Sequence, residues 1–215
     1  MRKITLDRER ILRALIPVVY VLPAAVCILT LVLFSVPRFS YIYLRIEHES
    51  MGMFTLLKNT WESCQATFDA KSVFYEQALF AYAMTAYTIV FWALLVVYVF
   101  FALYSSACAC VAFSNKPTSD RANYAKKLFV FVCFNRTTYI ILQLLPILLA
   151  TFPYILRSHY ESKLGMVMSL SYRGIPDFLI LLLAVTLSML AFLITLPLQR
   201  TLHLDMFRFY KRKNN

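Results

Sequence analysis

Four long runs without a charged residue dominate the pattern of polar and apolar positions. They cover residues 14–37, 78–113, 137–156 and 178–199. Each run exceeds the roughly 18 apolar residues that mark a transmembrane helix. Backbone groups in hydrocarbon have to bond within their own segment, so the runs predict helices rather than strands. We therefore expect an all-α integral membrane protein, a four-transmembrane-helix bundle in which residues 1–215 form a single membrane domain.

The second run is too long for a simple span. A helix rises about 1.5 Å per residue, so residues 78–113 exceed a hydrocarbon core of about 30 Å. The run contains no Gly, Pro or Asn at which a helical hairpin would turn. One long helix that either tilts or protrudes is expected. Ala102, Ser106 and Cys110 recur every four residues, which predicts a face that packs closely on another helix.

Five prolines lie within the runs: Pro17, Pro23, Pro146, Pro153 and Pro197. Each proline removes one backbone hydrogen bond and bends the helix that contains it. The functional interpretation is a hinge or a cavity. The simpler interpretation, which we favour, is ordinary helix shape, since membrane helices tolerate proline.

The connection 38–77 contains a second helical pattern. Its apolar residues recur at spacings of three and four, which is one face of a helix: Phe54, Leu57, Trp61, Cys64 and Phe68. The pattern predicts an amphipathic helix near 51–69 that lies on the membrane surface or caps the bundle. It would either bind a partner or, as we favour, seal its own bundle.

Basic residues are distributed unequally between the two sides of the predicted bundle. Fourteen lie in the N-terminal segment, the loop 114–136 without Arg136 itself, and the tail 200–215, against seven in the loops 38–77 and 157–177. Positively charged loops stay in the cytoplasm. This predicts that both termini are cytoplasmic and that 38–77 and 157–177 are outer loops. We expect the plasma membrane as the location, and an internal membrane stays an alternative because the charge pattern gives orientation alone.

The basic side is expected to contact the anionic lipids of the inner leaflet. The candidate contacts are Arg136, which would extend to the headgroups from the end of the third run, and Arg208, Lys211 and Arg212 in the tail. Within the inner loop, residues 117–120 read as a turn and helix N-cap followed by a helix to about 132. The pI near 9.6 reflects this asymmetry, so we expect no nucleic-acid partner.

The composition disfavours several kinds of functional site. The chain is 60% apolar and 15% charged, well away from a typical soluble domain. Three glycines are too few for a glycine-rich phosphate loop, and no cofactor motif is present. The five cysteines are scattered and are expected to be packing residues rather than a disulfide framework.

Candidate catalytic or metal-binding groups are weak. No run contains Asp, Glu or His, which disfavours a proton-relay carrier, and Gln143 is the one amide near the middle of a run. The first outer loop contains His48 between Glu47 and Glu49, and His159, Glu161 and Asp177 lie in or beside the second. Imidazole and carboxylate groups bind zinc or act as acid and base, but this spacing matches no known motif. We therefore expect neither a metal nor a catalytic site.

Three functions remain open. The first is a non-enzymatic accessory, scaffold or sensor subunit with a membrane-protein partner, because the spans offer packing faces and little chemistry. The second is a small permease or pore that works as a homo-oligomer, which an intramembrane polar cluster would favour. The third, a lipid-modifying enzyme that uses the outer histidines and glutamates, has the weakest basis. No motif identifies a family.

Overall fold

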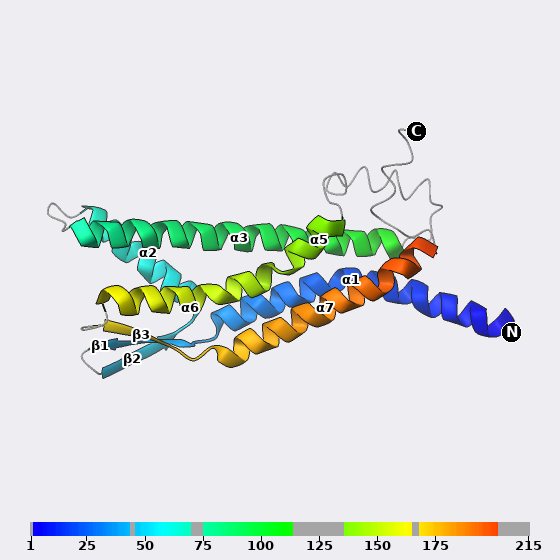
Figure 1. Cartoon of the computed structure of the whole chain (residues 1–215), viewed down its shortest axis with the longest axis horizontal. Helices are drawn as coiled ribbons and strands as arrows, with labels where there is room; N and C mark the ends of the chain where they lie inside the picture. Colours follow the sequence, from blue (N-terminus) through cyan, green and yellow to red (C-terminus); the bar gives the residue numbers. More distant parts are fainter. Residues whose placement is uncertain (1, 44–45, 70–74, 114–135, 165–167, 202–215) are drawn as a thin grey trace, which may run out of the picture. The chain divides into compact units, whose positions relative to one another are not determined.

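Four helical segments are long and apolar enough to cross a bilayer, and they coincide with the four uncharged runs (Figure 1). The computed structural model describes residues 2–43, 46–69, 75–113, 136–164 and 168–201. Three spans lie in the long helices α1 (Arg2–Ser35), α3 (Tyr75–Phe113) and α7 (Ile175–Thr201). The third span in the sequence combines the short α5 (Arg136–Gln143) with α6 (Leu145–Leu164). The predicted fold class, an all-α membrane bundle, is confirmed, and the chain is a multi-pass membrane protein.

α3 is one continuous helix of 39 residues, as predicted for the longest run. One row of its buried positions follows spacings of three and four: Ala81, Met84, Thr88, Phe91, Leu95, Tyr98, Ala102, Ser105 and Ala109. Phe101, Tyr104 and Cys108, beside this row, are also buried. This repeat of 3.5 residues keeps one face toward neighbouring helices over many turns. The predicted row is therefore only partly right: Ala102 is buried, Ser106 is half-buried and Cys110 is exposed. A row with a fixed spacing of four drifts around a helix of 3.6 residues per turn.

The third run is divided between two helices. α5 ends at Gln143 and α6 begins at Leu145, and the amide of Leu144 donates to the carbonyl of Ile141 over 3.0 Å. Pro146 explains the position of the break, because it has no N–H to donate and its ring crowds the preceding turn. The other four prolines of the runs lie inside continuous helices.

Helix α2 (Met53–Asp69) confirms the amphipathic helix expected near 51–69. Its buried face consists of Met53, Leu56, Leu57, Thr60 and Cys64. Trp61, which we predicted on this face, is 37% exposed, and Thr60 is buried in its place. The Thr60 hydroxyl donates to the carbonyl of Leu56, so burying this polar residue leaves no donor unmatched.

Three short strands form a sheet that the sequence pattern did not predict. β1 (Phe39–Tyr43) pairs antiparallel with β2 (Ile46–Met51) and with β3 (Met168–Tyr172), in the order β2-β1-β3. The aromatic and β-branched residues of β1 suit a strand. Gly52 joins β2 to α2 where a Cβ atom would lie 2.7 Å from the carbonyl oxygen of Ser35, so only glycine fits.

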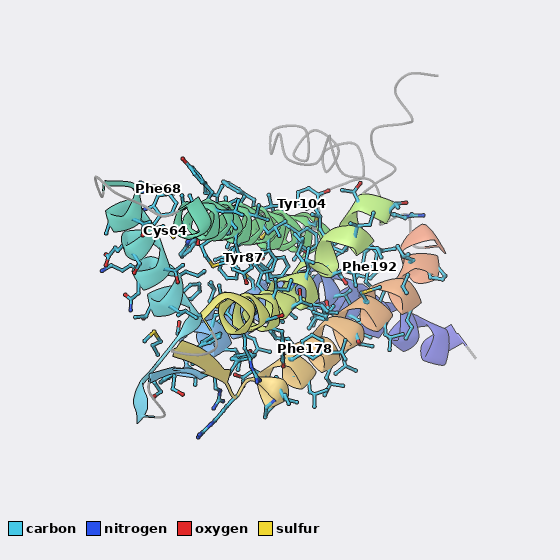
Figure 2. The ribbon with its side chains drawn as sticks, turned by 60° about the vertical axis from the view of Figure 1, so that its left-hand side comes forward. Cys64, Phe68, Tyr87, Tyr104, Phe178 and Phe192 are labelled. Atoms are coloured by element: carbon cyan, nitrogen blue, oxygen red, sulfur yellow. The ribbon has the colours of Figure 1, made fainter. Side chains whose placement is uncertain are left out.

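The chain divides into two compact units, each with its own core. The first unit contains 1–27, 98–146 and 182–215, and the second contains 28–97 and 147–181. In the first unit, the ring of Tyr139 stacks on Phe192 at 4.5 Å and meets Phe101 edge-on at 4.9 Å. In the second, α2 packs on α3 through ring pairs that include Phe68 and Tyr82 at 4.8 Å. Figure 2 labels Phe68 and Cys64 on α2 and Tyr87 on α3.

Hydroxyl groups of α3 donate to the backbone of neighbouring helices in both units. The Tyr87 hydroxyl donates to the carbonyl of Phe152 in the second unit. In the first unit, the Tyr98 hydroxyl donates to the carbonyl of Pro23 over 3.2 Å, and Ser105 donates to the carbonyl of Tyr20 and bonds the Tyr139 hydroxyl. These bonds reach α1 and α6 beside their prolines, where helix hydrogen bonding is disturbed.

The adjacent serines of α3 offer a matched test of these bonds. Ser105→Ala removes the contact with the backbone of α1, and we expect it to lower the free energy of unfolding by about 1 kcal/mol. Ser106→Ala is the control, because that hydroxyl bonds the carbonyl of Ala102 in its own helix. Reversible unfolding in mixed micelles measures both, and equal losses would contradict the interhelical role of Ser105.

Candidate functional site

An ion pair in the second unit joins two segments that are far apart in sequence. The Nε atom of Arg38 lies 2.7 Å from one carboxylate oxygen of Asp177, and Nη2 lies 3.1 Å from the other. The Asp177 side chain is 7% exposed and that of Arg38 is 38% exposed. This is the two-pronged geometry in which guanidinium and carboxylate groups match best.

Local structure explains why these two residues meet. The Arg38 amide donates to Met51 at the end of β2, and its carbonyl accepts from Arg173 just after β3, so the sheet fixes its backbone. Asp177 lies in the first turn of α7, where the helix dipole favours a negative charge. The bond to Asp177 raises the pKa of the Arg38 guanidinium, which therefore stays charged at any physiological pH.

Aromatic rings and a small cavity surround the ion pair. Tyr172 stacks on Phe39 at 4.5 Å and meets Tyr154 edge-on at 5.0 Å. Burial raises the pKa of the Tyr172 phenol, so this hydroxyl remains a neutral donor. The cavity has a volume of about 10 Å³ and is lined by Leu33, Phe34, Val36, Arg38, Phe39, Met53, Pro153, Tyr172 and Asp177. It has room for one water molecule and not for an organic substrate.

A strip of exposed, uncharged residues runs along α3 in the second unit. It consists of Leu79, Tyr82, Ala83, Ala86, Ile89, Val90, Ala93 and Val97. Tyr82 is 64% exposed although its ring contacts Phe68. Helix α7 is different: its large exposed residues are all leucine or isoleucine, which is typical of a lipid-facing surface.

The structure places the predicted outer candidates on separate elements. His48 lies on β2, and His159 and Glu161 lie on α6, but their side chains fall outside the described residues. Asp177, which we grouped with them by loop, is paired with Arg38 instead. Among the residues that were described, no group of three or more His, Cys, Asp or Glu side chains is placed to hold a metal.

The inner-leaflet candidates are only partly described. Arg136 is the first residue of α5 and is half-buried. Arg208, Lys211 and Arg212 lie outside the described residues, as does the inner helix expected after 117–120. Contact of these residues with anionic lipid stays a prediction.

Three of the four described cysteines agree with the packing role that we expected. Cys27, Cys64 and Cys108 are buried, whereas Cys110 is exposed and does not fit that expectation. Burial raises the pKa of the Cys64 thiol, which keeps it neutral and makes it a poor nucleophile. Cys133 lies outside the described part of the chain.

Sequence reasoning missed two features for the same reason. Arg38 and Asp177 are 139 positions apart, and only the sheet brings them together. The polar contacts of Ser105 with Tyr139 and Tyr20 also come from residues that look like ordinary span residues. The one available signal was Asp177 itself, an acid directly before an apolar run, which needs a partner wherever it is buried.

Comparison with known proteins assigns the chain to no family. No protein-family model, no curated protein and no solved structure matches this chain.

The ion pair predicts an unequal response to substitution of its two members. Arg38→Gln leaves a buried carboxylate without its partner, whereas Asp177→Asn leaves an arginine that still reaches water. We therefore expect Arg38→Gln to lower the thermal unfolding midpoint more than Asp177→Asn does. The double variant should recover part of the loss caused by Arg38→Gln. If both single variants lower the midpoint equally, and the double variant lowers it by the sum of the two losses, the two residues are not a coupled pair.

Proposed function

We propose that the protein is a non-enzymatic accessory or scaffold subunit of a membrane complex, and that the exposed strip of α3 binds its partner. The observation that carries the proposal is the length of this uncharged strip relative to the bilayer. A lipid-facing surface needs to be apolar only within the hydrocarbon core, so apolar residues beyond it require another explanation.

Contacts within the second unit indicate where the hydrocarbon core ends. Phe34, next to the last residue of α1, lies 5.7 Å from Phe91 of α3. The charged pair of Arg38 and Asp177 follows directly at the ends of α1 and α7. Charged groups prefer the edge of a bilayer to its centre. The boundary inferred on α3 therefore lies within about one turn of Phe91.

Two further features agree with this boundary. Trp92, which is partly exposed, suits the aromatic belt at a membrane surface. The amphipathic helix α2 packs along the preceding part of α3, through Phe54 on Trp92 and Phe68 on Tyr82. Residues 75–90 of α3 then extend about 24 Å beyond the core, at 1.5 Å per residue.

This extension still carries exposed apolar side chains, from Leu79 to Ile89. Water covers such a strip poorly. Phe68 of α2 contacts the strip at Tyr82, which stays 64% exposed, and Phe152 of α6 contacts Tyr87 outside the strip. Ala83 and Ala86 lie within it, and small residues allow another helix to approach closely. A membrane protein with an uncharged helix of similar length is the partner that fits.

The proposal also includes the orientation of the chain and the membrane in which it lies. The excess of basic residues in the N-terminal segment, the 114–136 loop and the tail supports cytoplasmic termini. The extension of α3 would then lie on the outer side of the plasma membrane. Arg136 and the basic tail would contact the anionic inner leaflet.

Spin-label accessibility tests the position of the boundary. Labels are attached at Ala83→Cys and Val97→Cys in a cysteine-free background, and the purified chain is reconstituted into vesicles. We expect a water-soluble nickel reagent to reach position 83 and oxygen dissolved in lipid to reach position 97. Preference for oxygen at position 83 would place the strip in lipid and remove its support for a partner. Low accessibility to both reagents would mean that a second copy covers the strip, which favours the homo-oligomer.

Native mass spectrometry after mild extraction from the native membrane tests the partner. We expect a different protein at fixed stoichiometry with the wild-type chain. Ala86→Trp introduces bulk into the interface, which we expect to weaken binding by about 5- to 150-fold, from the 1–3 kcal/mol typical of overpacking. Ala25→Trp is the matched control, an exposed alanine on α1. Equal retention of the partner by both variants would exclude the strip as its binding surface.

A further inference from the structure

A second feature, independent of the proposed partner surface, lies in the first unit. Tyr139 of α5 and Phe192 of α7 stack at 4.5 Å, and the two helices run in opposite directions (Figure 1). Gln143 lies one turn after Tyr139, and Ser188 lies one turn before Phe192. The amide and the hydroxyl therefore occupy the same level of facing helices.

Both side chains are buried, and each has a polar atom without a partner. Gln143 and Ser188 are each 3% exposed. The amide nitrogen of Gln143 is within reach of the Tyr139 hydroxyl, which also bonds Ser105. The amide oxygen of Gln143 and the hydroxyl of Ser188 have no hydrogen-bond partner in the described part of the chain. Buried polar groups are nearly always matched, so two together at one level indicate a missing occupant.

The helix break directly follows Gln143 and changes the backbone hydrogen bonding there. Pro146 has no N–H, so the carbonyl of Leu142 loses its usual helical donor. The Leu144 amide donates to Ile141 and is therefore directed away from the carbonyl of Ile140. Interrupted membrane helices expose backbone oxygens in this way where transporters coordinate Na⁺.

The set of groups favours one kind of occupant. The Gln143 amide oxygen, the Ser188 hydroxyl oxygen and the released backbone oxygens are all neutral oxygen ligands. Divalent cations are bound mainly through carboxylates. The only acid within the four spans is Asp177, which is paired with Arg38 in the other unit. Neutral oxygens alone suit a monovalent cation, as in the carbonyl rings of potassium channels.

We propose that Gln143, Ser188 and the broken turn at Leu144 form a buried binding site for one monovalent cation, of the size of Na⁺ or K⁺. Such a site gives the membrane domain a sensitivity to the ion composition of its surroundings. It requires no partner protein and no oligomer.

Thermal unfolding of the purified full chain in detergent tests the site. Midpoints are compared in NaCl, KCl and N-methylglucamine chloride at equal ionic strength. We expect one of the small cations to raise the midpoint saturably, by on the order of 3 °C at concentrations well above its dissociation constant. The same midpoint in all three salts would overturn the proposal and leave a buried water as the occupant.

Three variants locate the effect. Gln143→Met keeps the volume and removes the ligand, and Ser188→Ala is the milder change if the methionine variant does not fold. Both should lose the cation-dependent shift, whereas Ser106→Ala, whose hydroxyl bonds its own helix, should keep it. Retention of the full shift by both site variants would place the cation elsewhere. Because the purified chain is used alone, failure of this test leaves the partner proposal unaffected.

Discussion

Hydrocarbon contains no water to accept a hydrogen bond, so each polar group of a span has to be matched by another group of the protein. In this chain, α3 provides much of that matching. Tyr87, Tyr98 and Ser105 all lie on or beside its buried face, and each donates to a backbone carbonyl of α1 or α6. The acceptors lie within a turn of Pro23 or Pro153. Proline shapes these helices, and the hydroxyl groups of α3 stabilise that shape without any charge in the membrane.

The same constraint explains where the charges and the sheet are found. Arg38 and Asp177 meet at the ends of α1 and α7, where the guanidinium group still has access to water. The sheet begins at Phe39, one residue later. Short antiparallel strands leave unpaired groups at both edges of a sheet, so they suit a position outside hydrocarbon. Sheet and ion pair also depend on each other, because backbone bonds to Met51 and Arg173 position Arg38.

Sequence patterns predicted the elements well and the contacts between them poorly. The spans, the continuity of α3 and the extent of α2 follow from apolar run length and from helical period, which are local properties. Trp61 was misplaced because a stripe at spacings of three and four also fits a face rotated by one position, and packing selected Thr60. The pairing of β1 with β3 and the ion pair of Arg38 with Asp177 join residues more than 120 positions apart. Such contacts depend on which helix ends come together, and no local pattern carries that information.

The buried face and the exposed strip of α3 differ in what they contact, and this difference bears on function. The buried face is specified by its neighbours, through rings and hydroxyl groups that need fixed partners. The exposed strip is contacted by Phe68 at Tyr82 but leaves its alanines and aliphatic residues exposed, and it is not the leucine-rich surface of α7. Lipid chains fill irregular space around large aliphatic residues, whereas a rigid helix gains most contact where alanines allow close approach. An apolar strip that continues past the level of the ion pair is therefore better matched by protein than by lipid. Composition and position, rather than any catalytic group, distinguish this strip as a binding surface from the lipid-facing surface of α7.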